Sequence, residues 1–289
     1  MSLILGTAQL GMSYGVANKT GMPSTKEVRA ILDEAAGCGI TELDTAANYG
    51  ESESVIGRLA AGRFSITTKL PQIEPASDAY CLVKKSIDSS LGSLQVDHID
   101  TLLMHAPHQL DDVGGEEIWA ALEDLKREGK IGRLGYSLYR PTELDILYKR
   151  FSPDAVQLPM NVFDNRFGES GWLHRLFTDA VDIYTRSVFL QGILLQPADG
   201  RHPFFDKWQE FFNALDAARQ ECDLSPIRYC FAWLLQQNAH GKFVVGAESA
   251  SQVSEFAEAY HDSALHSGNL SMISCSDEDL LLPQNWILE

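Results

Sequence analysis

The chain has 289 residues, of which 45% are hydrophobic, and a formal net charge of −17 at pH 7. This length suits one large domain with a sizeable core, and the acidic balance argues against nucleic acid and anionic membranes as partners. With no CxxC pair among five cysteines, no secretory leader and no apolar run near the ~18 residues of a membrane span, we expect a cytoplasmic protein.

Eight short apolar runs are predicted as strands, and they occupy residues 3–5, 40–43, 64–68, 99–104, 131–136, 155–158, 182–186 and 242–245. Apolar residues at helical spacing predict helices at 25–36, 52–60, 77–91, 116–128, 141–149, 171–179, 203–221, 226–236 and 251–260. Alternating strands and helices imply a parallel sheet, and eight units favour a closed α/β barrel of the (β/α)8 TIM type over an open sheet. We expect this barrel to span residues 1–269 as a single domain.

Local signals support several of these boundaries. Ser24 can cap the helix at 25–36, with Glu27 at the capping-box position, and Pro141 suits the first turn of its helix. Glycines predict a flexible loop at 6–18 that can approach a ligand. Residues 270–289 are expected to form an irregular tail that packs on the barrel and can line its pocket.

Ionisable side chains follow three successive strands of this pattern. Asp44, Lys69 and His105 each stand at the carboxyl end of an apolar run, and Tyr49 lies in the loop after Asp44. Barrels of parallel strands keep their active sites at the carboxyl ends of the strands. Each residue alone has a structural explanation, such as a buried Asp–Lys ion pair or a packed tyrosine. The ordered set predicts a catalytic site at this end of the barrel.

The segment Asp-Thr-Ala-Ala-Asn-Tyr-Gly at 44–50, followed by Lys69 and His105 on the next two strands, resembles the aldo-keto reductases. The resemblance extends from Gly6 to about Tyr260. It implies NAD(P)H-dependent reduction of an aldehyde or ketone to an alcohol, with a small-molecule carbonyl compound as the substrate. The catalytic residues that it implies are Asp44, Tyr49, Lys69 and His105.

Elementary chemistry agrees with these roles. Hydride delivered to a carbonyl carbon leaves negative charge on the oxygen, which must then receive a proton. Tyr49 would donate that proton as general acid, and the ammonium of Lys69 would favour the phenolate that remains. Asp44 would keep Lys69 charged and in place, while His105 would hydrogen-bond the carbonyl oxygen.

The resemblance also implies a cofactor site built from strand ends and turns. Its residues would be Gly6, Thr7, Ser137, Gln157, Arg186, Ser187, Phe189, Gln191, Gly246, Ala247, Ser249, Gln252 and Glu255. Many members stack an aromatic ring on the nicotinamide where this chain has Arg186, whose guanidinium can stack in its place or turn towards a carboxylate. Leu138 replaces an Asn of the family, so one polar contact to the cofactor is lost.

The turn at 246–252 bears on the choice of cofactor. Members that prefer NADPH usually place Arg or Lys there to hold the 2′-phosphate, whereas this chain has Gly246, Glu248 and Gln252. A carboxylate suits a ribose 2′-hydroxyl and repels a phosphate. We therefore expect a weakened preference for NADPH, and both NADP(H), the family default, and NAD(H) stay open as cofactors.

The sequence says little about the substrate. The candidate pocket walls are Met12, Tyr14, Pro107, Tyr139 and Trp286. Aromatic walls favour apolar or sugar-like carbonyl compounds. Arg201, His202 and Lys207 could bind an acidic substrate or could simply begin a solvated helix.

Two other functions remain open at this point. One is a redox-sensing subunit that binds the cofactor with little turnover, and the other is an aldolase that uses Lys69 as a Schiff base. The complete set of four residues favours an enzyme over a sensor. The Gly246 turn and Gln157 weigh against an aldolase, which needs no adenine clamp. The remaining histidines form no spaced cluster, so no metal site is predicted.

Overall fold

The computed structural model describes residues 3–16, 18, 21–73, 78–238 and 240–288. Within these residues, eight parallel strands close into a barrel in which each strand pairs with the next and β8 pairs with β1. The strands are β1 (Leu3–Gly6), β2 (Glu42–Asp44), β3 (Ser65–Leu70), β4 (Ile99–Met104), β5 (Ile131–Ser137), β6 (Ala155–Pro159), β7 (Asp182–Arg186) and β8 (Lys242–Gly246). The predicted (β/α)8 barrel is confirmed.

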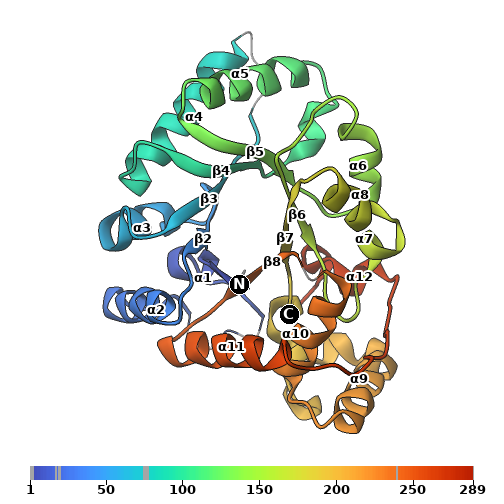
Figure 1. Ribbon diagram of the computed structural model, residues 1–289. Helices are drawn as coiled ribbons and strands as arrows, with labels where there is room; N and C mark the ends of the chain where they lie inside the picture. The colour runs from blue at the N-terminus through green and yellow to red at the C-terminus, as the bar shows by residue number, and fades with distance from the viewer. Residues whose placement is uncertain (1–2, 17, 19–20, 74–77, 239, 289) are drawn as a thin grey trace.

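A ring of helices surrounds the strands (Figure 1). The helices that connect the strands or follow the last one are α2 (Thr25–Gly37), α3 (Ser52–Ala60), α4 (Ala79–Leu94), α5 (Gly115–Arg127), α6 (Pro141–Leu147), α8 (Trp172–Thr178), α10 (Pro226–Gln237) and α11 (Ala250–Ser263). The other helical segments are α1 (Ala8–Gly11), α7 (Arg166–Glu169), α9 (Gln209–Glu221), α12 (Glu278–Leu281), η1 (Pro107–Leu110), η2 (Leu190–Leu195), η3 (Ala198–Gly200), η4 (Pro203–Trp208) and η5 (Pro283–Asn285). None of the helices in the described ranges has the length and apolar character that crossing a membrane requires.

Helix starts follow the capping signals of the sequence. The Ser24 side chain accepts a hydrogen bond from the Glu27 backbone N–H, and the Glu27 carboxylate accepts one from the Ser24 backbone N–H at 2.7 Å, so α2 has the expected capping box. Helix α4 was predicted from Ser77, which lies outside the described residues. It begins after Asp78, which accepts from the Cys81 backbone, and it continues to Leu94 because that residue extends the buried face.

The predictions were wrong in three segments. The loop at 6–18 contains α1, and Gly11 there serves a close contact: a Cβ would lie 2.2 Å from the Tyr49 carbonyl oxygen. The helix predicted at 203–221 is divided into the 3₁₀ segment η4 and the α-helix α9. Phe205 and Trp208, three residues apart, are both buried, which suits the three-residue turn of a 3₁₀ helix. The tail is not wholly irregular, since it contains α12 and η5.

The core has two parts, and a polar network closes one end of the barrel. A continuous apolar layer lies between strands and helices, and a small cluster around Ile4 and Leu103 fills the barrel interior. At the amino ends of the strands, the buried Tyr184 hydroxyl donates to Glu42 at 2.7 Å, and Lys242 donates to the same carboxylate at 3.2 Å. Polar groups at this end of a barrel serve stability, so chemistry is expected at the other end.

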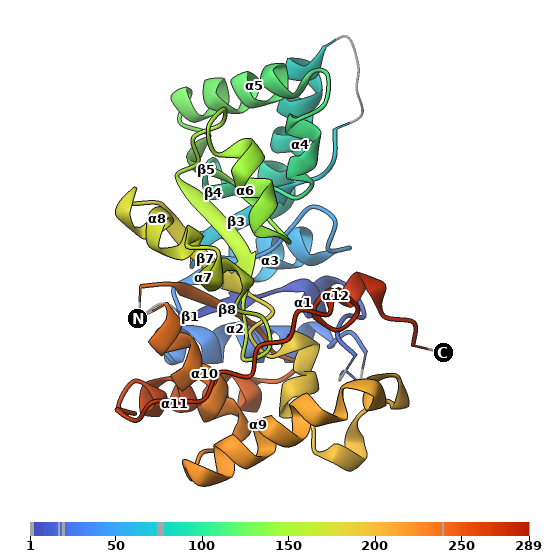
Figure 2. The same ribbon diagram turned by 90° about the vertical axis from the view of Figure 1, so that its right-hand side faces the viewer.

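The C-terminal tail runs from α11 past α10 to α12 (Figure 2). In that view α12 lies at the same end of the barrel as α1, which directly follows β1. Leu280 and Leu281 of α12 are buried, and the Trp286 ring meets the Phe205 ring with centroids 4.9 Å apart. The tail is therefore attached near the carboxyl ends of the strands.

Candidate active site

A buried ion pair joins the ends of β2 and β3. The Lys69 ammonium donates to Asp44 Oδ1 at 2.7 Å and to the Thr45 carbonyl oxygen at 2.9 Å. The side chains of Lys69 and Asp44 are only 1% and 5% exposed. Burial alone would lower the pKa of Lys69, but the charge of Asp44, aided by Tyr49, outweighs it and raises that pKa. Lys69 is thus held as an ammonium ion.

Tyr49 lies directly beside this ammonium. The Lys69 nitrogen is 5.0 Å from the centroid of the Tyr49 ring, and the His105 ring meets Tyr49 edge-on with centroids 5.8 Å apart. The loop that carries Tyr49 is held by α1, because the Glu51 backbone N–H donates to the carbonyl oxygen of Gly11 at 3.1 Å. The structure therefore brings together the four residues that were predicted as catalytic.

His105 faces the same space as a neutral imidazole. Burial, together with the charges of Lys69 and Arg186, lowers the pKa of His105 to about 4. Its Nδ1 atom is buried and has no hydrogen-bond partner in the part of the chain that the structure describes. A neutral ring with an unused nitrogen can donate to, or accept from, a bound molecule.

The second oxygen of Asp44 is held by Gln157 on β6. The Gln157 amide nitrogen donates to Asp44 Oδ2 at 2.7 Å, and the Ser137 hydroxyl donates to the Gln157 amide oxygen at 3.3 Å. Sequence reasoning assigned Ser137 and Gln157 to the cofactor and did not anticipate this bond. Each Asp44 oxygen therefore accepts a hydrogen bond, one from β3 and one from β6, and these two bonds fix the orientation of the carboxylate.

These residues open onto a cavity of about 590 Å³, a size typical of cofactor and small-molecule sites. The predicted residues that line it are Asp44, Tyr49, His105, Gly6, Thr7, Ser137, Gln157, Arg186, Ser187, Phe189, Gln191, Gly246 and Gln252. Lys69 is buried beneath the wall, and Ala247, Ser249 and Glu255 lie outside the lining. Further lining residues that sequence reasoning did not assign to a site include Gln9, Val188, Leu195, Gln196, Pro197 and Phe256.

The loop after β7 has an unusual backbone. Ser187, Leu190 and Gln191 have φ values of 58°, 46° and 52°, in the left-handed region that non-glycine residues rarely adopt. The Asn161 amide donates to the Ser187 carbonyl oxygen at 3.1 Å and helps to hold this shape. Such strained positions cluster where a backbone is shaped for a ligand, and this loop lines the cavity.

Arg186, at the end of β7, lines the cavity and meets no carboxylate among the residues that the structure describes. Its guanidinium donates to the Leu138 carbonyl oxygen at 2.9 Å and to the Ser187 hydroxyl at 3.2 Å. The guanidinium carbon lies 4.2 Å from the centroid of the Tyr139 ring. Within the described part of the chain, the alternative in which Arg186 turns to a carboxylate is therefore not observed. Leu138 itself is buried and holds Arg186 through its backbone.

The turn after β8 forms the other end of the cavity. The Ser249 side chain caps α11, and the Gln252 side chain accepts from the Glu248 backbone N–H at 2.7 Å. A Cβ on Gly246 would lie 2.2 Å from the Gln9 amide nitrogen, so the Gln9 side chain would have to move. A helix N-terminus beside a glycine suits a phosphate group, so the residues fit a dinucleotide. Burial raises the pKa of Glu248, the acidic residue of this turn.

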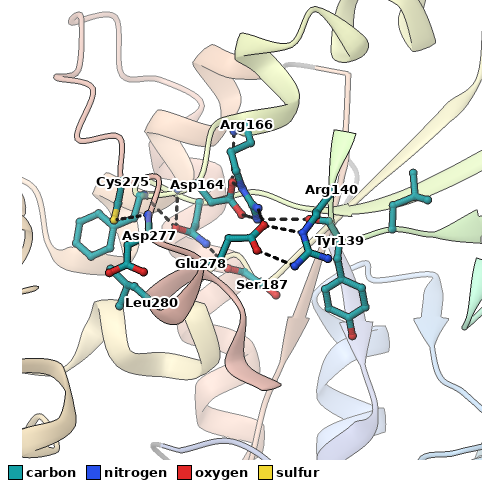
Figure 3. Close-up of polar contacts among 12 residues, drawn as sticks. Tyr139, Arg140, Asp164, Arg166, Ser187, Cys275, Asp277, Glu278 and Leu280 are labelled. Carbon is teal, nitrogen blue, oxygen red and sulfur yellow. Dashed lines mark hydrogen bonds and ion pairs between the residues drawn. The ribbon is translucent and has the colours of Figure 1, made fainter. Parts of the chain in front are cut away.

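The tail is clamped near the cavity mouth by Glu278 (Figure 3). Its carboxylate accepts from Arg140 at 2.7 and 2.6 Å and from Arg166 at 3.0 Å. Arg166 is itself held by both oxygens of Asp164 at 2.8 Å, and it reaches the Tyr139 carbonyl oxygen at 3.4 Å. The tail thus braces the loop that carries Tyr139, a wall of the cavity.

Of the predicted substrate contacts, Tyr14 and Tyr139 line the cavity, whereas Met12, Pro107 and Trp286 do not. The proposed acid-binding group is also not at the cavity. The Arg201 side chain is only 4% exposed and lies 3.6 Å from Asp216, and Lys207 lies 3.5 Å from Asp279. Arg201 therefore neither binds a substrate in the cavity nor lies in solvent at the start of a helix, the two alternatives considered for it. No group of His, Cys, Asp and Glu among the described residues is arranged to hold a metal ion.

Comparison with known proteins agrees with this geometry. A model of the Aldo/keto reductase family matches residues 2–274. The uncharacterized oxidoreductase YqkF of Bacillus subtilis is 27% identical over 277 residues, which cover 88% of this chain and 89% of the relative. A 6-dehydroglucose reductase of Agrobacterium fabrum is 26% identical over 82% of this chain and 83% of its own length.

Solved structures give the same fold. The holo form of an aldo-keto reductase from Bacillus halodurans superposes with a TM-score of 0.73 at 23% identity, over 93% of this chain and 88% of that one. The family match covers nearly the whole barrel that carries the buried ion pair and the cavity. The chain therefore belongs to the aldo-keto reductase family and is an NAD(P)H-dependent oxidoreductase.

Proposed function

We propose that the protein reduces an aldehyde or ketone to the alcohol with Tyr49 as the proton donor. The observation that carries this proposal is the Lys69 ammonium, held by Asp44 at 2.7 Å and lying 5.0 Å from the Tyr49 ring centroid at the cavity wall. The nicotinamide cofactor supplies the hydride when it is bound. As the carbonyl oxygen gains negative charge, it takes the proton of the Tyr49 hydroxyl.

The surrounding residues prepare this proton transfer. Lys69 stabilises the phenolate left on Tyr49, Asp44 holds Lys69, and Gln157 in turn holds Asp44. His105 is neutral at physiological pH, so it hydrogen-bonds the carbonyl oxygen without competing as an acid. Its buried, unused Nδ1 atom is consistent with a site that is completed by a ligand.

The test is Tyr49→Phe, which removes one hydroxyl and keeps the ring. We expect kcat to fall by about 10²–10⁴-fold, the usual contribution of general acid catalysis, with the melting temperature and cofactor affinity unchanged. Tyr80→Phe removes a hydroxyl on the surface of α4 and is the matched control. The substrates should include simple aldehydes and sugar-derived aldehydes, because one relative is named a 6-dehydroglucose reductase. A Tyr49→Phe protein that keeps its turnover would contradict the proposal.

A redox-sensing role predicts a different result. A sensor would bind the cofactor but would oxidise none of it with any carbonyl compound of the panel. Cofactor oxidation by the wild-type protein with a panel of carbonyl compounds therefore distinguishes the two functions before any variant is made.

For the cofactor, we propose that NAD(H) is accepted at least as well as NADP(H). Glu248 and Gln252 line the cavity at the turn after β8, where a 2′-phosphate would need a cation. Titration of protein fluorescence with NADH and NADPH measures both affinities. NADPH binding about tenfold or more tighter than NADH binding would overturn the proposal.

Substitution at Glu248 separates its charge from the rest of the turn. Glu248→Gln should strengthen NADPH binding and leave NADH binding nearly unchanged, because only the phosphate is repelled by the carboxylate. Glu258→Gln removes an equal charge from an exposed position of α11, the helix that follows this turn, and serves as the control. Equal changes for the two cofactors in Glu248→Gln would show that the carboxylate does not select between them.

A further inference from the structure

One positive charge in the cavity meets no carboxylate among the residues that the structure describes. Arg186 is the only Lys or Arg among the described residues that line the cavity, and it forms no ion pair with any of them. Other partly buried arginines of this chain do have carboxylates, as with Arg166 and Asp164 at 2.8 Å or Arg201 and Asp216 at 3.6 Å. In a chain of net charge −17, this arrangement leaves a cation available inside the cavity.

The guanidinium is held in place but is not saturated. Its two described hydrogen bonds go to neutral oxygens of Leu138 and Ser187, and its flat face lies against the Tyr139 ring at 4.2 Å. Five N–H groups belong to a guanidinium, so donors remain for another molecule. A half-buried charge without a counter-ion is costly, and an incoming anion would relieve that cost.

Arg186 also lies close to the reacting groups. Its charge helps to lower the pKa of His105, and it opposes the rise in the pKa of Tyr14 that burial causes. The nearest catalytic carboxylate, Asp44, is already bound by Lys69 and Gln157. The catalytic end of the cavity therefore offers an uncompensated positive charge beside the position of the carbonyl group.

From this arrangement we infer that the preferred substrates are aldehydes or ketones that also carry an anionic group, a carboxylate or a phosphate, which pairs with Arg186. The inference rests on the proposed carbonyl reduction at Tyr49 and names its substrate class. The competing use of Arg186 is to stack on the nicotinamide. Repulsion disfavours that use when the ring is oxidised and positively charged, and the variants below test it for the neutral reduced ring.

The test compares substrates of equal shape and different charge. 4-Formylbenzoate and 4-formylbenzamide differ only in the charge of the group opposite the aldehyde, and glycolaldehyde phosphate and glycolaldehyde provide a phosphate arm. We expect kcat/KM of the wild-type protein to be about tenfold or more higher for an anionic member of these pairs. The pair with the larger ratio of anionic to neutral kcat/KM shows whether the site prefers a carboxylate or a phosphate. Equal kcat/KM values within both pairs would overturn the inference.

The variants assign that preference to Arg186. Arg186→Gln should remove the advantage of the anionic substrate, so kcat/KM should fall at least about tenfold more for the anionic member of a pair than for the neutral one. Arg186→Lys keeps the charge and should retain part of the preference. Arg175→Gln removes an arginine that covers the Trp172 ring on the outside of the barrel, so it controls for loss of a stacked cation. Equal losses for both substrates, or a loss of NADH affinity, would assign Arg186 to the cofactor and overturn the inference.

A binding measurement separates this inference from the proposed function. Calorimetry on the NAD-loaded protein compares 4-(hydroxymethyl)benzoate with 4-(hydroxymethyl)benzamide, the alcohols of the aromatic pair. Binding of the benzoate that is about tenfold tighter in the wild type and is lost in Arg186→Gln supports an anion site even if no aldehyde is reduced. Equal binding of the two alcohols overturns it, whereas absence of turnover alone overturns only the reductase proposal.

Discussion

Removal of either member of the buried Asp44–Lys69 pair should cost much more stability than removal of both. The two side chains are 5% and 1% exposed and their charged atoms are 2.7 Å apart. Asp44→Asn leaves a buried ammonium and Lys69→Met leaves a buried carboxylate, and each loss should lower the free energy of unfolding by about 3–5 kcal/mol. Asp44→Asn combined with Lys69→Met leaves no buried charge, so it should cost less than either single change.

Urea unfolding of the cofactor-free protein, followed by tryptophan fluorescence, measures these differences. With an m-value of about 3 kcal/mol/M, each single variant should unfold at about 1–1.7 M less urea than the wild type. Asp88→Asn is the matched control, because Asp88 and Lys130 are as close, at 2.8 Å, but 45% and 32% exposed. Removal of this exposed pair should change the urea midpoint far less, because solvent screens its charges.

The pH dependence provides an independent check. The raised pKa of Lys69 means that its contribution is fully present below the unfolded value of about 10.4 and is lost only above it. In Asp44→Asn, burial without the carboxylate lowers that pKa. The native state then binds fewer protons than the unfolded state, so the stability of this variant should rise between about pH 7 and 10. If the losses of unfolding free energy measured for Asp44→Asn and Lys69→Met simply added up in the double variant, the reasoning about the buried pair would be refuted.

Three further predictions concern other parts of the molecule. Because the pKa of His105 falls from 6.5 to about 4 on folding, the native state binds fewer protons in this window. Stability should therefore decrease as the pH falls from 6.5 to 4, by at most about 3 kcal/mol, and urea titrations of His105→Gln should show a flatter profile. Gly57→Ala should lower the melting temperature, because the new Cβ would lie 2.1 Å from a backbone oxygen of α4. Gly92→Ala, at a helix position with open space around it, should raise the melting temperature. Equal shifts of the melting temperature in the two variants would contradict this. Glu278→Gln should speed hydrogen exchange in residues 270–288 while global stability changes by less than about 1 kcal/mol, and Asp279→Asn should leave that exchange unaltered.

The barrel could be predicted because each of its signals is local. An apolar run of a few residues gives a strand, helical spacing gives the covering helix, and Ser24 with Glu27 gives a helix start, all within one short window. Parallel strands then share one carboxyl edge, so Asp44, Lys69 and His105 at successive strand ends were bound to meet. The candidate site followed from order along the chain and needed no knowledge of long-range contacts.

The features that the sequence left undecided depend on residues far apart in the chain. The Gln157–Asp44 bond joins positions 113 residues apart, and the Arg140–Glu278 contact joins positions 138 residues apart. No spacing rule relates such partners, since only closure of the barrel places β6 against Asp44 and the tail against the loop after β5. The same holds for Arg186, whose choice of neutral oxygens over a carboxylate is set by the packing around it. The sequence by itself therefore determined the barrel and the chemistry at its carboxyl edge, while the tertiary structure decided how each charge there is paired, because pairing depends on distances that only the folded chain defines.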